Sequence, residues 1–400
     1  MAESVRYLAF LVATYYFLQA MGGNPGLHVQ ALQKFVKEVW QFSPAQAAAF
    51  NAFLVIPWMI KPLYGLVSDF LPILGSRRKS YFILMGLIAG SFYFLLDVLG
   101  TSKEAVSWLL FNAALAIAFS DVLCDAVMVE KGQPLNATDR LQSWQWFALG
   151  SAGVIIAFSK GYVAEYLPLG QAVRLSMLAP LFMVVFSAVA LKEERRSSSG
   201  EAARQAWQGL KKAIRLKSLW GAAVFIFLFN CSPSLGTVLY YYEKDFLKFS
   251  DVLIGHIDTA GSIGFIAGTA LFGLAAKRFS HEVLIRVIIV SGILSTLAYL
   301  LFQGAASGFL VSGIASIIGV AAFLGPLTLA AKVCPKYAEG TVFALLMSVA
   351  NFGMQAGQII GGKLYENIGY SWLVVISAAF TALMWFFLPL VRERQSNKNA

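Results

Sequence analysis

The chain has 400 residues, of which 58% are hydrophobic and only 13% are charged, and its mean hydropathy is +0.69. A soluble globular chain carries about 45–50% apolar and about 25% charged residues. These values exclude an ordinary soluble protein and predict an all-α integral membrane protein. The net charge of +10 alone would suggest a nucleic-acid partner, but the cations are distributed as membrane topology requires, so we expect no nucleic acid.

Apolar segments of the length that crosses a bilayer follow one another along the chain. We expect membrane spans at residues 6–37, 45–68, 80–99, 105–130, 141–165, 171–191, 217–242, 251–276, 283–303, 308–332, 340–364 and 370–391. With both termini in the cytoplasm, most of the 31 Lys and Arg residues fall on the cytoplasmic side, as the positive-inside rule requires. The flipped orientation would place the basic clusters outside, so both termini are predicted to be cytoplasmic.

The first span begins within a few residues of Met1, and we find neither a transit peptide nor a small-residue cleavage site before it. We therefore expect a multi-pass protein of the cell (inner) membrane. An organelle envelope is the alternative location.

The sequence also argues against an enzyme or a metalloprotein. Cys124, Cys231 and Cys334 are isolated from one another, so neither a disulfide framework nor a CxxC metal site is available. The three histidines are far apart, and the HExxH, GxSxG and Walker A patterns do not occur. We expect no catalytic residues, no metal and no cofactor. Without a Walker A pattern, ATP-driven transport by this chain alone is not expected.

The chain is similar to itself at an offset of about 208 residues. The matched positions are Pro25 with Pro233, Ser43 with Ser250, and Gly65 with Gly273. Matches in the same order at a nearly constant offset indicate that a six-helix unit was duplicated. We predict an N-terminal six-helix bundle at residues 1–191, a cytoplasmic linker at 192–216 and a C-terminal six-helix bundle at 217–400.

Pro25 and Pro233 interrupt the first helix of each half. Backbone groups freed by such a break cannot face lipid, so they must face protein or a watery cavity. Broken helices at matching positions of a repeated bundle are typical of secondary transporters. A kink without any role in ligand binding is the alternative.

The stretch IPWMIKPLYGLVSDFLPILGSRRKSY, at residues 56–81, places a lysine and a proline in an apolar span, followed by an aspartate and three cations. Its part KPLYGLVSD…GSRRKSY, together with SDVLCDAVMVE at 120–130 and EGTVFALLMSVANFG at 339–353, resembles the folate–biopterin transporter family of the major facilitator superfamily. The resemblance extends over both halves. It implies a major-facilitator-type bundle of 12 transmembrane helices in two six-helix halves.

The same resemblance implies a secondary active transporter that moves folates or pterins across the membrane by alternating access. We expect a monomer whose partners are a small-molecule substrate, protons and the lipid bilayer. A transporter of another small organic anion or metabolite is one alternative. A non-transporting receptor on the same fold is the other.

One set of residues is expected to form the cytoplasmic gate. Gly65 lets a neighbouring helix approach closely, and Asp69 can pair with an arginine while it faces the positive N-terminus of the eleventh helix. Such contacts would hold the cytoplasmic side shut in one state and break in the other. The predicted gate residues are Gly65, Asp69, Arg77, Arg78, Glu130 and Arg140. A role in setting topology is the alternative for the cations of residues 77–79.

Lys61 lies about two turns deeper in the membrane than Asp69, where a cation costs roughly 2.5–3.5 kcal/mol and usually marks a pathway. It is predicted to attract an anionic ligand or to pair with an acid, unless it extends to the inner surface. Asp121 and Asp125 share a helical face. Two carboxylates in a dry site repel each other, so we expect the pair to hold the coupling proton. A structural salt bridge with Lys61 or Arg140 is the alternative.

The eleventh helix carries Gly353, Gly357 and Gly361, which form a smooth stripe for close helix contact. Nearby polar side chains are expected to be hydrogen-bond partners of a pterin or ties between helices. The predicted substrate-binding residues are Lys61, Asp121, Asp125, Asn351 and Gln355.

Overall fold

A computed structural model describes residues 2–23, 26–99, 102–193, 217–276, 281–333 and 339–390. Cys334 and most of the predicted linker, residues 194–216, lie outside this part of the chain. The first half forms α1 (Ala2–Gly22), α2 (Val29–Glu38), α3 (Pro44–Met59), α4 (Lys61–Phe70), α5 (Lys79–Leu99), α6 (Lys103–Gly132), η1 (Gln133–Leu135), α7 (Thr138–Tyr166) and α8 (Leu169–Ala190). The second half forms α10 (Lys217–Asn230), α11 (Gly236–Tyr241), η2 (Tyr242–Phe246), α12 (Asp251–Ala276), α13 (His281–Ala298), η3 (Tyr299–Leu301), α14 (Ala305–Val333), α15 (Glu339–Leu383) and η4 (Met384–Leu390).

The helices follow the spans expected from hydropathy closely. Within the described residues, eight helical stretches are long and apolar enough to cross a membrane, and two further apolar helices are shorter. The eleventh and twelfth predicted spans are joined in α15, which breaks at Gly369. The φ of +77° at this residue is readily adopted by glycine but not by residues with a side chain. The predicted helical membrane bundle is therefore confirmed, and twelve is an approximate count of its spans.

The second predicted span is divided into α3 and α4 at Ile60, whose φ of −102° and ψ of 15° are not helical. Pro57 and Pro62 flank this break, and neither has a backbone N–H to continue the helical ladder. The hydroxyl of Tyr64 donates a 2.9 Å hydrogen bond to the carbonyl oxygen of Pro57, so this carbonyl group near the break has a hydrogen-bond partner. Lys61 is therefore the first residue of a new helix inside the membrane.

The first helix of the second half is broken around Pro233, between α10 and α11, as the repeat predicts. Its counterpart Pro25 lies outside the described residues. The glycine stripe of α15 packs against this break, because a Cβ atom on Gly357 would lie only 2.4 Å from the carbonyl oxygen of Ser232. The N–H of Ser234 donates a 2.9 Å hydrogen bond to the carbonyl oxygen of Gly357. Backbone groups at the break are thus satisfied inside the protein.

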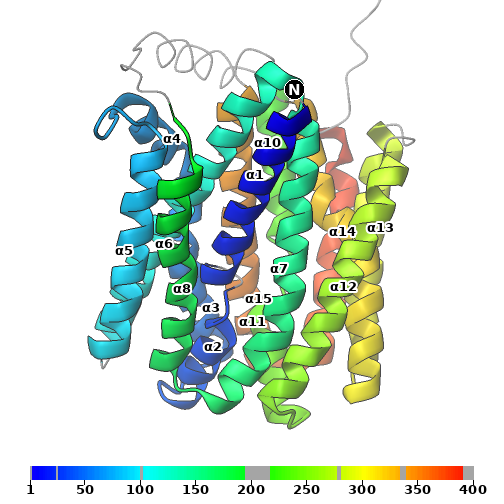
Figure 1. Ribbon diagram of the computed structural model, residues 1–400. Helices are drawn as coiled ribbons and strands as arrows, with labels where there is room; N and C mark the ends of the chain where they lie inside the picture. Colours follow the sequence, from blue (N-terminus) through cyan, green and yellow to red (C-terminus); the bar gives the residue numbers. More distant parts are fainter. Residues whose placement is uncertain are drawn as a thin grey trace, which may run out of the picture.

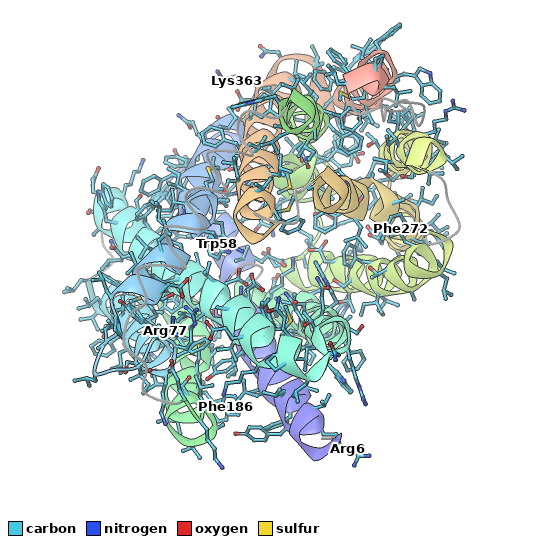
Figure 2. All side chains as sticks on the ribbon, turned by 90° about the horizontal axis from the view of Figure 1, so that it is seen from above. Arg6, Trp58, Arg77, Phe186, Phe272 and Lys363 are labelled. Carbon is cyan, nitrogen blue, oxygen red and sulfur yellow. The ribbon has the colours of Figure 1, made fainter. Side chains whose placement is uncertain are left out.

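The two halves, residues 2–193 and 217–390, lie side by side (Figures 1 and 2). They meet where α7 packs along α12 and α3 packs along α15. α1 begins and α8 ends at the same end of the bundle, which we call the termini side; α2 lies at the opposite end, the far side (Figure 1). Seen from above, Trp58 lies near the middle of the molecule, whereas Arg6 and Lys363 lie at its periphery (Figure 2).

Candidate functional site: an interface cavity beside a buried ion cluster

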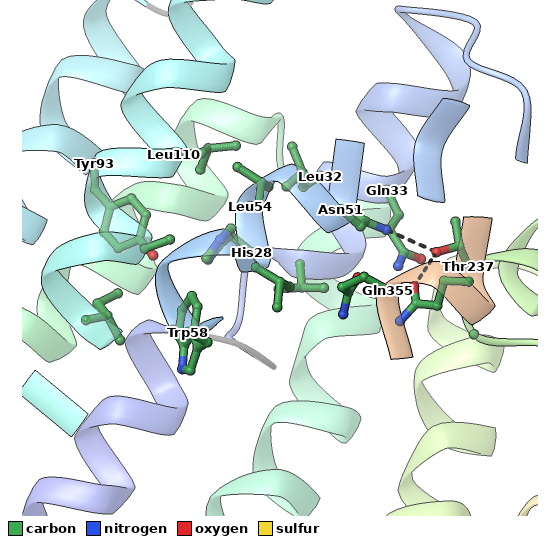
Figure 3. A pocket seen from close by; sticks show the side chains of 17 residues that line it. His28, Leu32, Gln33, Asn51, Leu54, Trp58, Tyr93, Leu110, Thr237 and Gln355 are labelled. Atoms are coloured by element: carbon green, nitrogen blue, oxygen red, sulfur yellow. Dashed lines mark hydrogen bonds between the residues drawn. The ribbon is translucent and has the colours of Figure 1, made fainter. Parts of the chain in front are cut away.

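A cavity of about 270 Å³ lies between the two halves (Figure 3). Helices α2, α3, α5, α6, α11 and α15 contribute to its wall. The polar side chains of the wall are Gln33, Asn51, Thr237, Gln355 and Gln358, and the ring-bearing ones are His28, Trp58 and Tyr93. Small-molecule sites are concave and mostly apolar, with a few convergent polar groups. This wall has that composition.

The polar part of the wall connects the two halves. The Asn51 amide donates a 3.1 Å hydrogen bond to the Thr237 hydroxyl, which donates a 3.1 Å hydrogen bond to the amide oxygen of Gln358 (Figure 3). Gln355, which was predicted to bind substrate, lines the cavity and is only 7% exposed. Its buried Oε1 atom accepts no hydrogen bond from the described residues. Asn351, predicted with it, lies one turn away on α15, half-buried and outside the residues of the wall.

The ring-bearing part of the wall is held by the first half. The His28 ring lies 5.3 Å from the Tyr93 ring in an edge-to-face arrangement, and its Nδ1 atom is 2.9 Å from the Ser176 hydroxyl. The hydroxyl of Tyr93 donates a 2.6 Å hydrogen bond to the carbonyl oxygen of Gly22. These contacts immobilise two rings on one side of the cavity, so a flat ligand would meet pre-formed ring surfaces there.

A buried ion cluster lies next to the cavity, toward the termini side. Lys61 on α4 forms an ion pair with Asp121 on α6. The Gln19 amide donates a 2.6 Å hydrogen bond to Asp121, and the Tyr16 hydroxyl donates one to Asp125. This pairing is the salt bridge that the sequence left open, with Lys61 and not Arg140 as the cation. The side chain of Asp121 is 9% exposed and that of Lys61 is 28% exposed.

Three members of the cluster, Asp121, Gln19 and Lys61, lie about one helical turn along the chain from a residue of the cavity wall. Asp121 follows Ile117 by four residues on α6, and Gln19 precedes Gly23 by four residues on the chain. Lys61 comes three residues after Trp58. The cluster therefore lies beside the cavity along the helix axes, toward the termini side, and its members are not among the residues that line the cavity. Sequence reasoning missed Tyr16 and Gln19; a glutamine among the mostly apolar residues at the end of α1 was the available signal.

Arg78 organises a second polar cluster on the termini side. Its guanidinium donates to the carboxylates of Asp69 and Glu130 and, at 2.6 Å, to the hydroxyl of Ser68. Asp69 and Glu130 are therefore brought together as expected, but all of these partners belong to the first half. Of the other predicted gate residues, Gly65 accepts a 3.1 Å hydrogen bond from the hydroxyl of Ser68 at its carbonyl oxygen, Arg77 is half-buried, and Arg140 is exposed on α7.

Glu193 ties the turn before α5 to the end of α8. Its carboxylate accepts hydrogen bonds from the backbone N–H groups of Arg77, Arg78 and Lys79 and from the hydroxyl of Ser76. Burial acts to raise the pKa of Glu193, but these hydrogen bonds outweigh it and hold the pKa below the ordinary value of 4.5. The carboxylate is thus a fixed anion at the start of α5, where the helix dipole also favours it.

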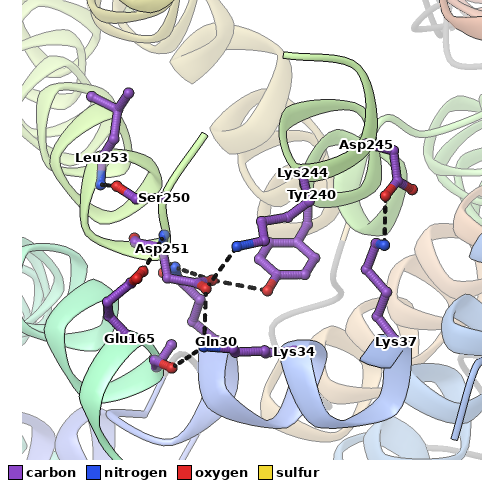
Figure 4. A network of polar contacts seen from close by, with 11 residues as sticks. Gln30, Lys34, Lys37, Glu165, Tyr240, Lys244, Asp245, Ser250, Asp251 and Leu253 are labelled. Carbon is purple, nitrogen blue, oxygen red and sulfur yellow. Dashed lines mark hydrogen bonds and ion pairs between the residues drawn. The ribbon is translucent and has the colours of Figure 1, made fainter. Parts of the chain in front are cut away.

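Polar contacts close the far side between the halves (Figure 4). Asp251, at the start of α12, is fully buried and accepts from Tyr240 at 2.8 Å and from Lys244 at 2.9 Å. The Gln30 amide, from α2 of the first half, donates to the backbone oxygen of Asp251 at 2.8 Å. Beside it, Lys37 forms a 2.6 Å ion pair with Asp245. A buried carboxylate is stable only with such partners.

The sequence analysis did not name this far-side network. Gln30, Lys34 and Lys37 recur at helical spacing and form one polar face of the short helix α2. Lys34 also lies 3.5 Å from Asp251. A polar stripe just after the break at Pro25 was therefore the signal that could have indicated a contact with the second half.

No group of three or more His, Cys, Asp or Glu side chains in the described part of the chain is placed to hold a metal ion. Cys124 is buried between Asp121 and Asp125 on α6, and Cys231 is half-buried.

Two relatives match almost the whole chain. A folate-biopterin transporter of Synechocystis is 29% identical over 419 residues, covering 98% of this chain and 82% of the relative. Probable folate-biopterin transporter 2 of Arabidopsis thaliana is 27% identical over 419 residues, covering 97% and 83%. The crystal structure of a mutant of the nucleoside transporter NupG superimposes with a TM-score of 0.75 at 15% identity, covering 96% of this chain and 100% of that one.

The fold, with its cavity between two helical bundles, is that of a major-facilitator-type membrane transporter, and the named relatives are transporters and not enzymes. Residues 22–398 match the model of the BT1 family. The chain belongs to the BT1 family.

Proposed function

We propose that this transporter moves folates or pterins across the membrane by alternating access and couples their movement to protons. The observation that carries the proposal is the cavity between the halves, whose wall combines fixed rings with amide groups. A pterin is flat and has hydrogen-bond donors and acceptors on its edges, so this wall suits it. The names of the Synechocystis and Arabidopsis relatives support the same substrate class.

Protons are assigned to the buried carboxylates. Asp121 and Asp125 lie one turn apart on α6 near the cavity, and among the described residues Lys61 is the cation that forms an ion pair with them. Two carboxylates that share one cation in a site of low dielectric favour the uptake of a proton. The pair is therefore proposed as the coupling site, and the position of Asp121 one turn from the wall residue Ile117 allows substrate and proton to affect one another.

The two ends of the molecule are assigned to two gates. The far-side network around Asp251 supports a gate that is closed in this conformation. The cluster on the termini side is proposed as the opposite gate, with the residues Gly65, Asp69, Arg77, Arg78, Glu130 and Arg140. We place the termini in the cytoplasm and the protein in the cell membrane as a monomer. We divide it into bundles at 1–191 and 217–400, joined by the linker 192–216.

The test is uptake by purified protein in sealed vesicles, with labelled folate and labelled biopterin, each with and without an inward pH gradient. Saturable uptake that the gradient drives above equilibrium supports coupled transport. Uptake that only equilibrates would remove the proton from the proposal. Binding without any uptake would indicate a receptor, and saturable uptake of other organic anions but of neither ligand would indicate a different substrate.

A further inference from the structure

The cavity wall is electrically neutral. Among the described residues that line it there is no Lys, Arg, Asp or Glu. Its titratable rings, His28 and Tyr93, are engaged with Ser176 and with the carbonyl oxygen of Gly22. The buried Oε1 atom of Gln355 accepts no hydrogen bond from the described residues, and such an acceptor favours a ligand that brings a donor. The wall therefore suits an uncharged heteroaromatic ring, and its described lining residues offer no cation to the carboxylates of a folate tail.

Lys61, a cation near this wall, is already paired. Lys61 follows Trp58 of the wall by three residues, and its ammonium group is bound by Asp121, with Asp125 one turn away on the same helix. Two carboxylates against one ammonium leave a net negative cluster when both are ionised. A carboxylated ligand would be repelled by that cluster, because charges interact strongly in a site of low dielectric.

We propose that a carboxylated ligand competes with Asp121 for Lys61 and gains it only when the Asp121/Asp125 pair has taken up a proton. An uncharged pterin needs only the neutral wall and binds regardless of that proton. This inference rests on the proposed function. It divides the ligands of one transporter into a class whose binding affinity depends on that proton and a class whose binding affinity does not.

The surroundings of Asp121 accommodate both protonation states. Gln19 donates its amide N–H to the ionised carboxylate, while its own Oε1 atom is buried and accepts no hydrogen bond from the described residues. If Asp121 gains a proton, rotation of the Gln19 amide supplies this oxygen as the acceptor. The other titratable groups facing the pair are Lys61 from α4, Tyr16 from α1 and Cys124 from α6 itself.

The experiment measures the Kd of folate and of biopterin for the purified protein between mildly alkaline and mildly acidic pH. Free carboxylates with a pKa of about 4.3 stay ionised over this range. The affinity for folate is expected to rise on acidification, by up to about tenfold per pH unit for one linked proton, while the Kd of biopterin stays constant. Asp121→Asn is expected to remove the pH dependence for folate and to retain tight binding.

Asp97→Asn is the matched control. The side chain of Asp97 is 9% exposed, as is that of Asp121, and it is also in an ion pair, but its partner is Arg174 on α8, and neither residue belongs to the cavity wall or to the Lys61 cluster. This variant should keep the pH dependence of the wild-type protein. If Asp121→Asn does not fold, Lys61→Gln tests the same step. It should lower folate affinity to the high-pH level at every pH and leave the Kd of biopterin unchanged.

Equal pH dependence for both ligands would overturn the inference, and so would a pH-independent Kd for folate. In either case uptake of both ligands into vesicles would still stand, so the proposed function survives such a result. Failure to bind or transport either ligand would overturn the function and the inference together.

Discussion

Lys61 at the start of α4 forms an ion pair with Asp121 in the middle of α6. The lysine directly follows the proline-flanked break between α3 and α4 at Ile60. Asp125, one turn further along α6, accepts instead from the hydroxyl of Tyr16. Two carboxylates on one helical face thus have different partners. Asp121 therefore has a cation as its partner, whereas Asp125 has a neutral hydroxyl.

The Lys61–Asp121 pair should show strong energetic coupling. Lys61→Ala leaves a buried carboxylate without its cation, so it is expected to lower stability more than Lys61→Ala combined with Asp121→Asn. A double-mutant cycle of thermal unfolding in detergent is expected to give a coupling energy of about 0.5–3 kcal/mol. Additive effects of the two changes would mean that the pair contributes no specific interaction.

The carboxylate pair should be required for accumulation but not for movement of substrate. Asp121→Asn combined with Asp125→Asn mimics the protonated state, so exchange of substrate at equilibrium is expected to continue. Uptake driven by a pH gradient is expected to fall to the equilibrium level, because the pair can no longer bind and release a proton. Both assays use the same vesicles, with Asp97→Asn as the control. Accumulation equal to wild type in the double variant would remove the pair from the coupling mechanism.

Asp251 should hold the far side closed. Asp251, at the start of α12, binds Lys244 of the second half and Lys34 of the first half. Asp251→Asn removes its charge and weakens this contact between the halves, so the state open to the far side is expected to become more populated. A reporter cysteine at Leu54, in the cavity wall, should then react faster with an impermeant thiol reagent from the far side and more slowly from the termini side. Asp97→Asn breaks an ion pair within the first half and should not change this ratio. An unchanged ratio in Asp251→Asn would refute the gate.

Glu193 should contribute stability that disappears in acid. Its pKa is held below the ordinary value of 4.5 by hydrogen bonds from residues 76–79, so its contribution is present above about pH 4.5. The contribution is lost as the pH falls through the lowered pKa. Glu193→Gln is therefore expected to lower the unfolding temperature at neutral pH and to flatten its decline in acid. Glu104→Gln, at an exposed position at the start of α6, is the control. An acid decline in Glu193→Gln as steep as in the wild type would contradict this role.

Much of the fold could be predicted because the bilayer imposes a local rule. A span must be apolar over its whole length and must satisfy its own backbone, so hydropathy alone located the helices to within a few residues. The glycine stripe of α15 and the break at Pro233 were also visible, because close helix contact requires small residues and proline cannot continue a helix. The spacing of Asp121 and Asp125 placed both carboxylates on one face for the same local reason.

The partners of the charged residues were decided only by the tertiary structure. The cost of a buried charge predicts that Lys61 and Asp121 need partners but does not say which ones, because every acid and base in the bundle is a candidate. The contact of Gln30 with Asp251 joins residues from opposite halves, so no local pattern specifies it. The neutral cavity wall likewise arises only where helices of both halves meet. Sequence determined which segments cross the membrane and which faces are polar, and packing of the two halves determined which polar groups meet.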